Sequence, residues 1–339
     1  MDVLEKMRSP ENLRKLFTSA SEVIDLPAQF IEKDYWVTKF LKTLFSNEPQ
    51  IIFKGGTCLS KCHSAIRRFS EDIDVSYLSK NGPMAVQPTQ SERKKFKEAV
   101  KKTADDLGLE ILNLDSTRSK RLFNQYRIAY PRLFQGANIG VVNLLVVETA
   151  MQTPTFPTTF AKADNYISQY FSKIGEDLRA VDLGMEPFPI RTITLERTYV
   201  DKVFAVCDYY LCGRIERNSR HIYDLCKLSS QIDKSKLPEI IEQVRGFRKK
   251  SPTCYSVQPG VDISEVLDKI VRTNFYKDDY NNVTRLLFYK GEDLPYEEAI
   301  TEIEAIRDEG LFIDEDDNPG DASGIGETSE SEQKYEFYR

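Results

Sequence analysis

Apolar residues recur at helical spacing near the start of the chain. The stretches 10–23 and 27–45 both show this spacing, and the second begins with Pro27, a residue favoured in the first turn of a helix. The apolar run at 51–53 has the length of a short buried strand, and DIDVSYL at 72–78 alternates as a second strand does. Two helices and two strands are therefore predicted in this part.

The segment between those two strands predicts a turn and a short helix. Gly55 and Gly56 end the first strand, and residues 57–65 suffice for one or two helical turns. The predicted order is strand, turn, helix, strand.

The rest of the chain divides into a strand-rich part and a helical part. A charged helix at 90–107 is followed by alternating segments that predict strands within 109–114, 121–130 and 139–150, whereas 153–188 shows no regular pattern. Helical spacing then recurs in 196–211, 219–231, 237–246, 264–274, 279–288 and 296–309. We predict an α+β fold, with N-terminal helices and a mixed β-sheet in 1–190 and a helical domain in 191–312.

Charge is distributed unevenly along the 339 residues. The segment 313–339 has nine acidic side chains against Lys334 and Arg339, which accounts for the whole net charge of −6 and leaves the body close to neutral. Such an acidic tail is typical of a disordered segment. Basic residues also cluster in the body, at 67–68, 93–97, 118–121 and 245–250; these clusters are either solvated helix faces or a path for nucleic acid.

Composition favours a cytoplasmic protein without a membrane partner. No run approaches the roughly 18 apolar residues of a membrane span. The start, MDVLEKMRSPENLRKLF, lacks the apolar core of a signal peptide. The six cysteines include no Cys-x-x-Cys pair, so we expect reduced thiols.

Asp72 and Asp74 are the first candidates for chemistry. At positions i and i+2 of a strand their carboxylates project from the same face, where their repulsion favours a bound divalent cation. The glycine turn lets backbone N–H groups approach a ligand, and the helix N-terminus after it favours an anion. Each fragment alone is typical of an ordinary turn or a solvent-facing pair. Their order and spacing instead favour a site for a magnesium-bound triphosphate.

The stretch FKGGTCLSK…RRFSEDIDV at 53–75 resembles the signature of the AbiEii/AbiGii-type nucleotidyltransferases. This family belongs to the DNA polymerase β-like superfamily and includes toxins of bacterial toxin–antitoxin and phage-defence systems. Three further segments resemble family motifs: EKDYWVTKFL at 32–41, LERTYVDKVFAV at 195–206 and SRHIYDLCKL at 219–228. The resemblance implies a polymerase β-like nucleotidyltransferase core followed by the helical domain.

The resemblance also implies roles for individual residues. Gly55, Gly56 and Thr57 would form the phosphate-contacting turn, and Asp72 and Asp74 would bind the metal, Mg²⁺ or alternatively Mn²⁺. Two further residues, Lys202 and Asp224, would steady the triphosphate and complete the site between the two domains, respectively. The family usually has serine after Gly-Gly-Thr, where this chain has Cys58.

A third carboxylate is expected on a neighbouring strand. Glu148 shares one strand face with Val142, Leu144 and Val146, whereas Asn143 lies on the other. We favour Glu148 as metal ligand and as base for the attacking hydroxyl, because asparagine cannot accept that proton. The alternative is a plain glutamate at the solvent edge.

Several of these residues also have purely structural interpretations. Lys202 could be one exposed charge on a long helix, and Asp224 could pair with Arg220 four residues earlier on a helix capped by Ser219. Lys33 and Asp34 are predicted to pack against the sheet as neighbours of the site.

The function implied by the resemblance is transfer of NMP from an NTP to an acceptor hydroxyl, with release of pyrophosphate. The acceptor would be the 3′ end of tRNA, and the protein would act as a toxin neutralised by a cognate antitoxin. Two alternatives remain open: transfer to a protein side chain, and a regulator that binds the nucleotide without turning it over.

Overall fold

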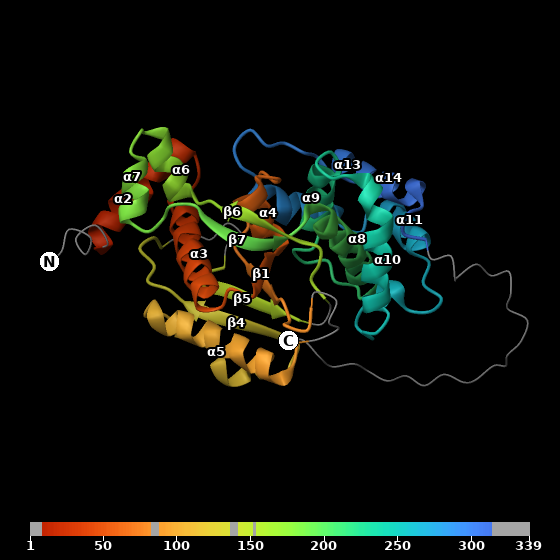
Figure 1. Cartoon of the computed structure of the whole chain (residues 1–339). Helices are drawn as coiled ribbons and strands as arrows, with labels where there is room; N and C mark the ends of the chain where they lie inside the picture. The colour runs from red at the N-terminus through yellow and green to blue at the C-terminus, as the bar shows by residue number, and fades with distance from the viewer. Residues whose placement is uncertain (1–8, 83–87, 136–141, 152–153, 314–339) are drawn as a thin grey trace, which may run out of the picture.

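The computed structural model describes residues 9–82, 88–135, 142–151 and 154–313 (Figure 1). Its centre is a seven-stranded mixed sheet of order β3-β4-β5-β2-β1-β7-β6. The strands are β1 (Ile51–Lys54), β2 (Ile73–Tyr77), β3 (Glu110–Ile111), β4 (Phe123–Ala129), β5 (Leu145–Ala150), β6 (Thr158–Ala163) and β7 (Phe188–Ile193). The predicted α+β class is confirmed. The acidic tail from 314 on lies outside the described residues, so disorder there stays a prediction.

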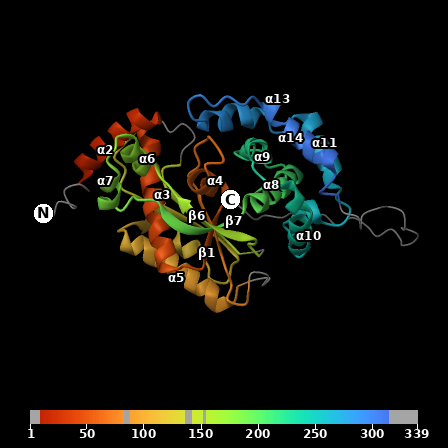
Figure 2. The ribbon, with the colours of Figure 1, turned by 45° about the horizontal axis from the view of Figure 1, so that its top comes forward.

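The helices form two groups (Figures 1 and 2). Those around the sheet are α2 (Pro10–Ile24), α3 (Ala28–Asn47), α4 (Gly55–His63), α5 (Gln90–Asp106), α6 (Tyr166–Lys173) and α7 (Asp177–Asp182). Those gathered beside it are α8 (Leu195–Leu211), α9 (Arg220–Ser229), α10 (Leu237–Arg248), α11 (Ile263–Thr273), α12 (Lys277–Asp279), α13 (Tyr296–Ala299) and α14 (Thr301–Glu309). Among the described residues no helix has the length and apolar character needed to cross a membrane.

Two segments differ from the prediction. The region 153–188, in which no regular pattern was expected, contains β6, α6 and α7, and β7 begins at its last residue. These elements are six to eight residues long, too short for a periodic pattern to stand out. The helix predicted at 279–288 is instead a π-helical turn at Tyr280–Thr284 followed by a 3₁₀ turn at Arg285–Leu287.

The sheet packs one face against α3 and α5. Phe53, Val75 and Val147 are fully buried in a cluster that includes Phe40 of α3 and Phe96 of α5. Side chains at alternate positions of these strands point to the opposite face. That second face lies toward the helical domain (Figure 2), and it carries the candidate site.

The helices beside the sheet are joined to it by shared packing. Leu59 of α4 lies in one apolar cluster with Val203 of α8 and Ile222 of α9. The loop between α4 and β2 adds backbone contacts, since the Phe69 N–H donates to the Leu287 carbonyl over 2.7 Å. The end of α4 and the start of β2 are therefore held at the boundary between the two helical groups.

Candidate active site

Four polar side chains stand in one row across four strands. Lys54 of β1 lies opposite Asp74 of β2, Asp74 lies beside Glu148 of β5, and Glu148 lies opposite Gln125 of β4. Residues in register on neighbouring strands share a face and lie roughly 5 Å apart at Cβ. The strand pairing therefore brings Asp74 and Glu148 together although they are far apart in sequence. We call Asp72, Asp74 and Glu148 the carboxylate row.

The carboxylate row concentrates negative charge. Burial, reinforced by the charges of Glu148 and Asp72, raises the pKa of Asp74 to about 7, although Lys54 and Arg220 oppose the shift. Like charges held this close are relieved by a bound cation, and carboxylate oxygens are the donors that Mg²⁺ prefers. The donor chemistry therefore fits a divalent metal.

Two members of the row are engaged by other side chains. The Arg220 guanidinium lies 3.3 Å from Asp72 Oδ2, and the Gln125 amide donates to Glu148 Oε1 over 2.9 Å. Within the described ranges no group of three His, Cys, Asp or Glu side chains is arranged to hold a metal ion. Asp72 would thus exchange Arg220 for the metal, whereas Gln125 engages only Oε1 of Glu148.

The two glycines contact different sides of the site. Gly55 has φ +76°, and a Cβ there would lie 2.0 Å from Asp74 Oδ2. A Cβ on Gly56 would lie 2.8 Å from both Arg68 Nη2 and Ser70 Oγ. Glycine is therefore required at 55 by both conformation and space. The helix α4 begins at Gly55 itself rather than after a separate turn, so unpaired N–H groups of its first turn lie beside Asp74.

A second ionic group lies on the helical side, and we call Arg68, Lys202 and Asp224 the clasp. Arg68 Nε and Nη2 donate to the two Asp224 oxygens over 2.8 and 2.7 Å, and Lys202 Nζ lies 2.6 Å from Oδ2. All three side chains are buried. Burial opposes ionisation of Asp224, but Arg68 and Lys202 outweigh it and hold its pKa well below its ordinary value. Lys202 is therefore not the exposed surface charge of the structural interpretation.

Helix capping and the loop before β2 bring the clasp together. Thr194 accepts from the Arg197 N–H and caps α8, which places Lys202 about two turns into that helix. Ser219 precedes α9 as predicted, but it makes no capping bond; its buried hydroxyl donates to Asp279. Ser219 is thus the N-cap residue as predicted, but its side chain does not cap the helix, because Asp279 offers that hydroxyl a charged acceptor.

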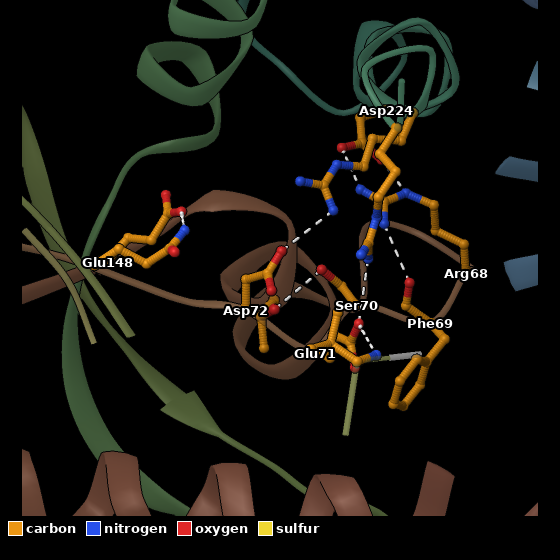
Figure 3. A network of polar contacts seen from close by, with 12 residues as sticks. Arg68, Phe69, Ser70, Glu71, Asp72, Glu148 and Asp224 are labelled. Atoms are coloured by element: carbon orange, nitrogen blue, oxygen red, sulfur yellow. Dashed lines mark hydrogen bonds and ion pairs between the residues drawn. The ribbon is translucent and has the colours of Figure 1, made fainter. Parts of the chain in front are cut away.

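Arg220 connects the clasp to the carboxylate row. It pairs with Asp72, so it does not form the surface pair with Asp224 that the four-residue spacing allowed. Burial opposes its charge, but Asp72, Asp74 and Asp224 outweigh burial and raise the Arg220 pKa. Figure 3 shows Asp72 between Arg68 and Asp224 on one side and Glu148 on the other.

Thr57 and Cys58 are both buried. The Thr57 hydroxyl is 3.0 Å from Ser70 Oγ, so it is engaged inside the protein. Burial raises the pKa of the Cys58 thiol well above its ordinary value, with Cys62 and Asp74 adding to the shift. Cys58 is therefore a neutral core side chain at the position where the family usually has serine.

The charged residues Lys33 and Asp34 of α3 support the segments next to the site. Lys33 is buried, donates to the Val142 carbonyl over 2.8 Å and lies 3.4 Å from Glu71. Asp34 accepts from the Tyr166 N–H over 3.0 Å and pairs with Lys61. Glu71 directly precedes Asp72, so Lys33 fixes the chain next to the carboxylate row.

Sequence reasoning missed Arg68 and Gln125. Arg68 stands 156 positions from Asp224, and Gln125 meets Glu148 only through strand register. No local pattern could have paired them. Lys54 directly precedes the glycines, so its position next to the site could have been predicted from the sequence.

Comparisons with known proteins identify the family and support the fold. A family model described as "Nucleotidyl transferase AbiEii toxin, Type IV TA system" matches residues 39–307. Among solved structures, MenT4, a nucleotidyltransferase toxin from Mycobacterium tuberculosis, superposes with a TM-score of 0.56 at 17% identity, over 91% of each chain. No curated protein sequence matches.

Proposed function

Because this chain belongs to the AbiEii family of nucleotidyltransferase toxins of type IV toxin–antitoxin systems, we propose that it transfers NMP from an NTP to the 3′ hydroxyl of tRNA. The observation that carries the proposal is the strand register that sets Glu148 beside Asp74. In this proposal Glu148 is the base for the acceptor hydroxyl and Asp74 binds the metal, so the two roles fall on neighbouring strands. The magnesium ion, the tRNA acceptor and the residue roles below are parts of this proposal.

Asp72 and Asp74 would hold Mg²⁺ with the triphosphate. When bound, the ion would neutralise charge on the α-phosphate. Glu148 accepts the proton of the acceptor hydroxyl, whose oxygen bonds to the α-phosphorus. The bond from that phosphorus to the bridging oxygen breaks, and pyrophosphate leaves with its electron pair.

Positive charge on the helical side favours the triphosphate there. The clasp carries two cations against one carboxylate, and Arg220 adds another cation beside Asp72. The free N–H groups at the start of α4 supply further donors. We assign Lys202 to the charge that develops on the β- and γ-phosphates, with Asp224 holding it in place.

The test is incubation of the purified protein with each α-³²P-labelled NTP and separate pools of tRNA and protein. Label is expected at the tRNA 3′ end, and Asp72→Asn is the matched control that should give none. Label found only on protein would contradict the tRNA acceptor and favour a side-chain hydroxyl. Binding of NTP without label on either pool would favour the non-catalytic regulator.

We further propose that this transfer is the basis of toxicity in the cytoplasm, where a cognate antitoxin protein neutralises it, and that it serves phage defence. Expression of wild type should stop growth, whereas Asp74→Ala should not. Equal growth arrest by both proteins, at equal expression, would separate toxicity from this site.

A further inference from the structure

Beyond Glu148, the second face of the sheet continues onto β4 and is open. Gln125 and Arg127 alternate on this face, and both are exposed. The Leu112 N–H donates to the Arg127 carbonyl over 2.8 Å, which continues the β3–β4 register and sets Leu112 beside Arg127 on the same face. We call Leu112, Gln125 and Arg127 the shelf.

Arg127 is an uncompensated cation next to the site. Its guanidinium has no hydrogen bond or ion pair with any residue in the described parts of the chain. By contrast, the basic clusters seen in the sequence contain several cations with acidic partners, such as Lys95 with Glu48 over 2.6 Å and Lys94 with Glu98 over 3.7 Å. Arg127 therefore places a free charge on the open face of the sheet. Arg127 and Glu148 are diagonal neighbours on this face, roughly 7–8 Å apart from Cα to Cα.

Leu112 adds an exposed apolar surface to this charge. Its side chain is 53% exposed although it lies beside the sheet. Its neighbour Asn113 fixes the local backbone, because its side chain donates to the Gln125 carbonyl and accepts from the Arg127 N–H, each over 2.9 Å. The backbone thus holds Leu112 and Arg127 side by side, so an apolar surface and a free cation lie next to each other, as a base and its phosphate require.

The direction of the reaction points to the same surface. Attacking and leaving oxygens lie roughly in line through the phosphorus. Because the cations of the clasp and Arg220 favour the leaving pyrophosphate on one side of Asp72, the acceptor belongs on the Glu148 side (Figure 3). The shelf is the continuation of the sheet on that side.

We propose that the shelf binds the last nucleotides of an RNA acceptor, with a backbone phosphate on Arg127 and a base against Leu112. This inference rests on the proposed RNA acceptor and adds where and how it binds. Gln125 meanwhile keeps its amide on Glu148 and so positions that carboxylate for proton acceptance.

The experiment measures kcat/KM for the RNA acceptor against salt concentration in wild type, Arg127→Ala, Arg127→Lys and Leu112→Ala. The matched control is Arg272→Ala on α11, which removes the same charge from the helical domain. In Arg127→Ala the acceptor KM should rise about threefold to tenfold with the NTP KM unchanged, and the slope of log kcat/KM against log salt should become shallower by about 0.7, the share of one single-strand phosphate contact. Arg127→Lys should retain the wild-type slope. Leu112→Ala should raise the acceptor KM and leave the slope at its wild-type value.

A slope in Arg127→Ala equal to that of wild type, with RNA still labelled by both proteins, would overturn the shelf alone. Failure of wild type to label any RNA would overturn the RNA acceptor and the shelf together. Retention of the circular dichroism spectrum in each variant excludes misfolding as the cause.

Discussion

The carboxylate row and the clasp are neighbouring ionic groups with opposite charge balance. In the row, burial and two like charges raise the Asp74 pKa to about 7. In the clasp, Arg68 and Lys202 give both Asp224 oxygens a cationic partner within 2.8 Å. A buried carboxylate with cationic partners contributes to the fold, whereas carboxylates with excess like charge are prepared for a cation. Compensation of the carboxylate charge, more than burial, therefore separates the two groups, and Lys202 is the member of the clasp that we also assign to the triphosphate.

Removal of divalent metal should give the largest difference between the effects that depend on the row and those that depend on the clasp. With EDTA in excess, transfer should fall at least about a thousandfold, the factor that several kcal/mol of lost charge stabilisation represents. The free energy of unfolding should fall only by the binding energy of the metal and less than when the clasp is broken, because the clasp contains its own counter-ions. Scintillation counting of labelled RNA and urea titration measure the two quantities, and Mg²⁺ or Mn²⁺ in excess of EDTA should restore transfer. Undiminished transfer in EDTA would contradict a metal role for the row.

Breaking the clasp should instead damage the fold. Asp224→Asn leaves Arg68 and Lys202 buried without a full counter-charge, so the free energy of unfolding should fall by about 3–5 kcal/mol. Urea titration monitored by tryptophan fluorescence checks this. The control is Asp224→Asn with Lys202→Met, which removes one stranded cation and should recover part of the loss. Wild-type stability in the single variant would show that the clasp is not a structural unit.

The adjacent glycines allow the two groups to be disturbed one at a time. Gly55→Ala adds a Cβ against Asp74 at a φ of +76°, which should cost about 1–2 kcal/mol of strain and reduce transfer by displacing that carboxylate. Gly56→Ala presses on Arg68 and Ser70 instead. It should lower stability with a smaller loss of transfer at low temperature, where both variants are folded. The reverse order of transfer rates would contradict the assignment of Gly55 to the row.

The smallest effect is expected from the residue that positions Glu148. Gln125→Ala removes the 2.9 Å contact to Glu148 and should lower kcat about tenfold, as loss of an orienting partner does. Because Gln125 is exposed, stability should change by no more than about 0.5 kcal/mol. Steady-state kinetics at saturating NTP measure the loss. Full activity in Gln125→Ala would remove Gln125 from the site.

The sequence predicted the local parts of this site and not the contacts between distant segments. Strand alternation set Asp72 and Asp74 on one face, and Glu148 was favoured over Asn143 because asparagine cannot accept a proton; in the structure Glu148 lies beside Asp74. Arg68 and Arg220 could not be paired with their acids, because each pair joins residues about 150 positions apart. Such pairs depend on how the helical domain packs on the sheet, which a hydrophobic pattern does not specify.

The most direct measurement of the central claim is a paired assay of Asp74→Asn: transfer of labelled NMP to tRNA under single-turnover conditions, and urea unfolding of the same sample. Transfer should fall by more than about a hundredfold, which is more than the loss expected from an orienting residue. The free energy of unfolding should equal or exceed that of wild type, because one of the three like charges is gone. Transfer at the wild-type rate by the folded variant, or a loss of stability as large as that of Asp224→Asn, would contradict the division between the two groups.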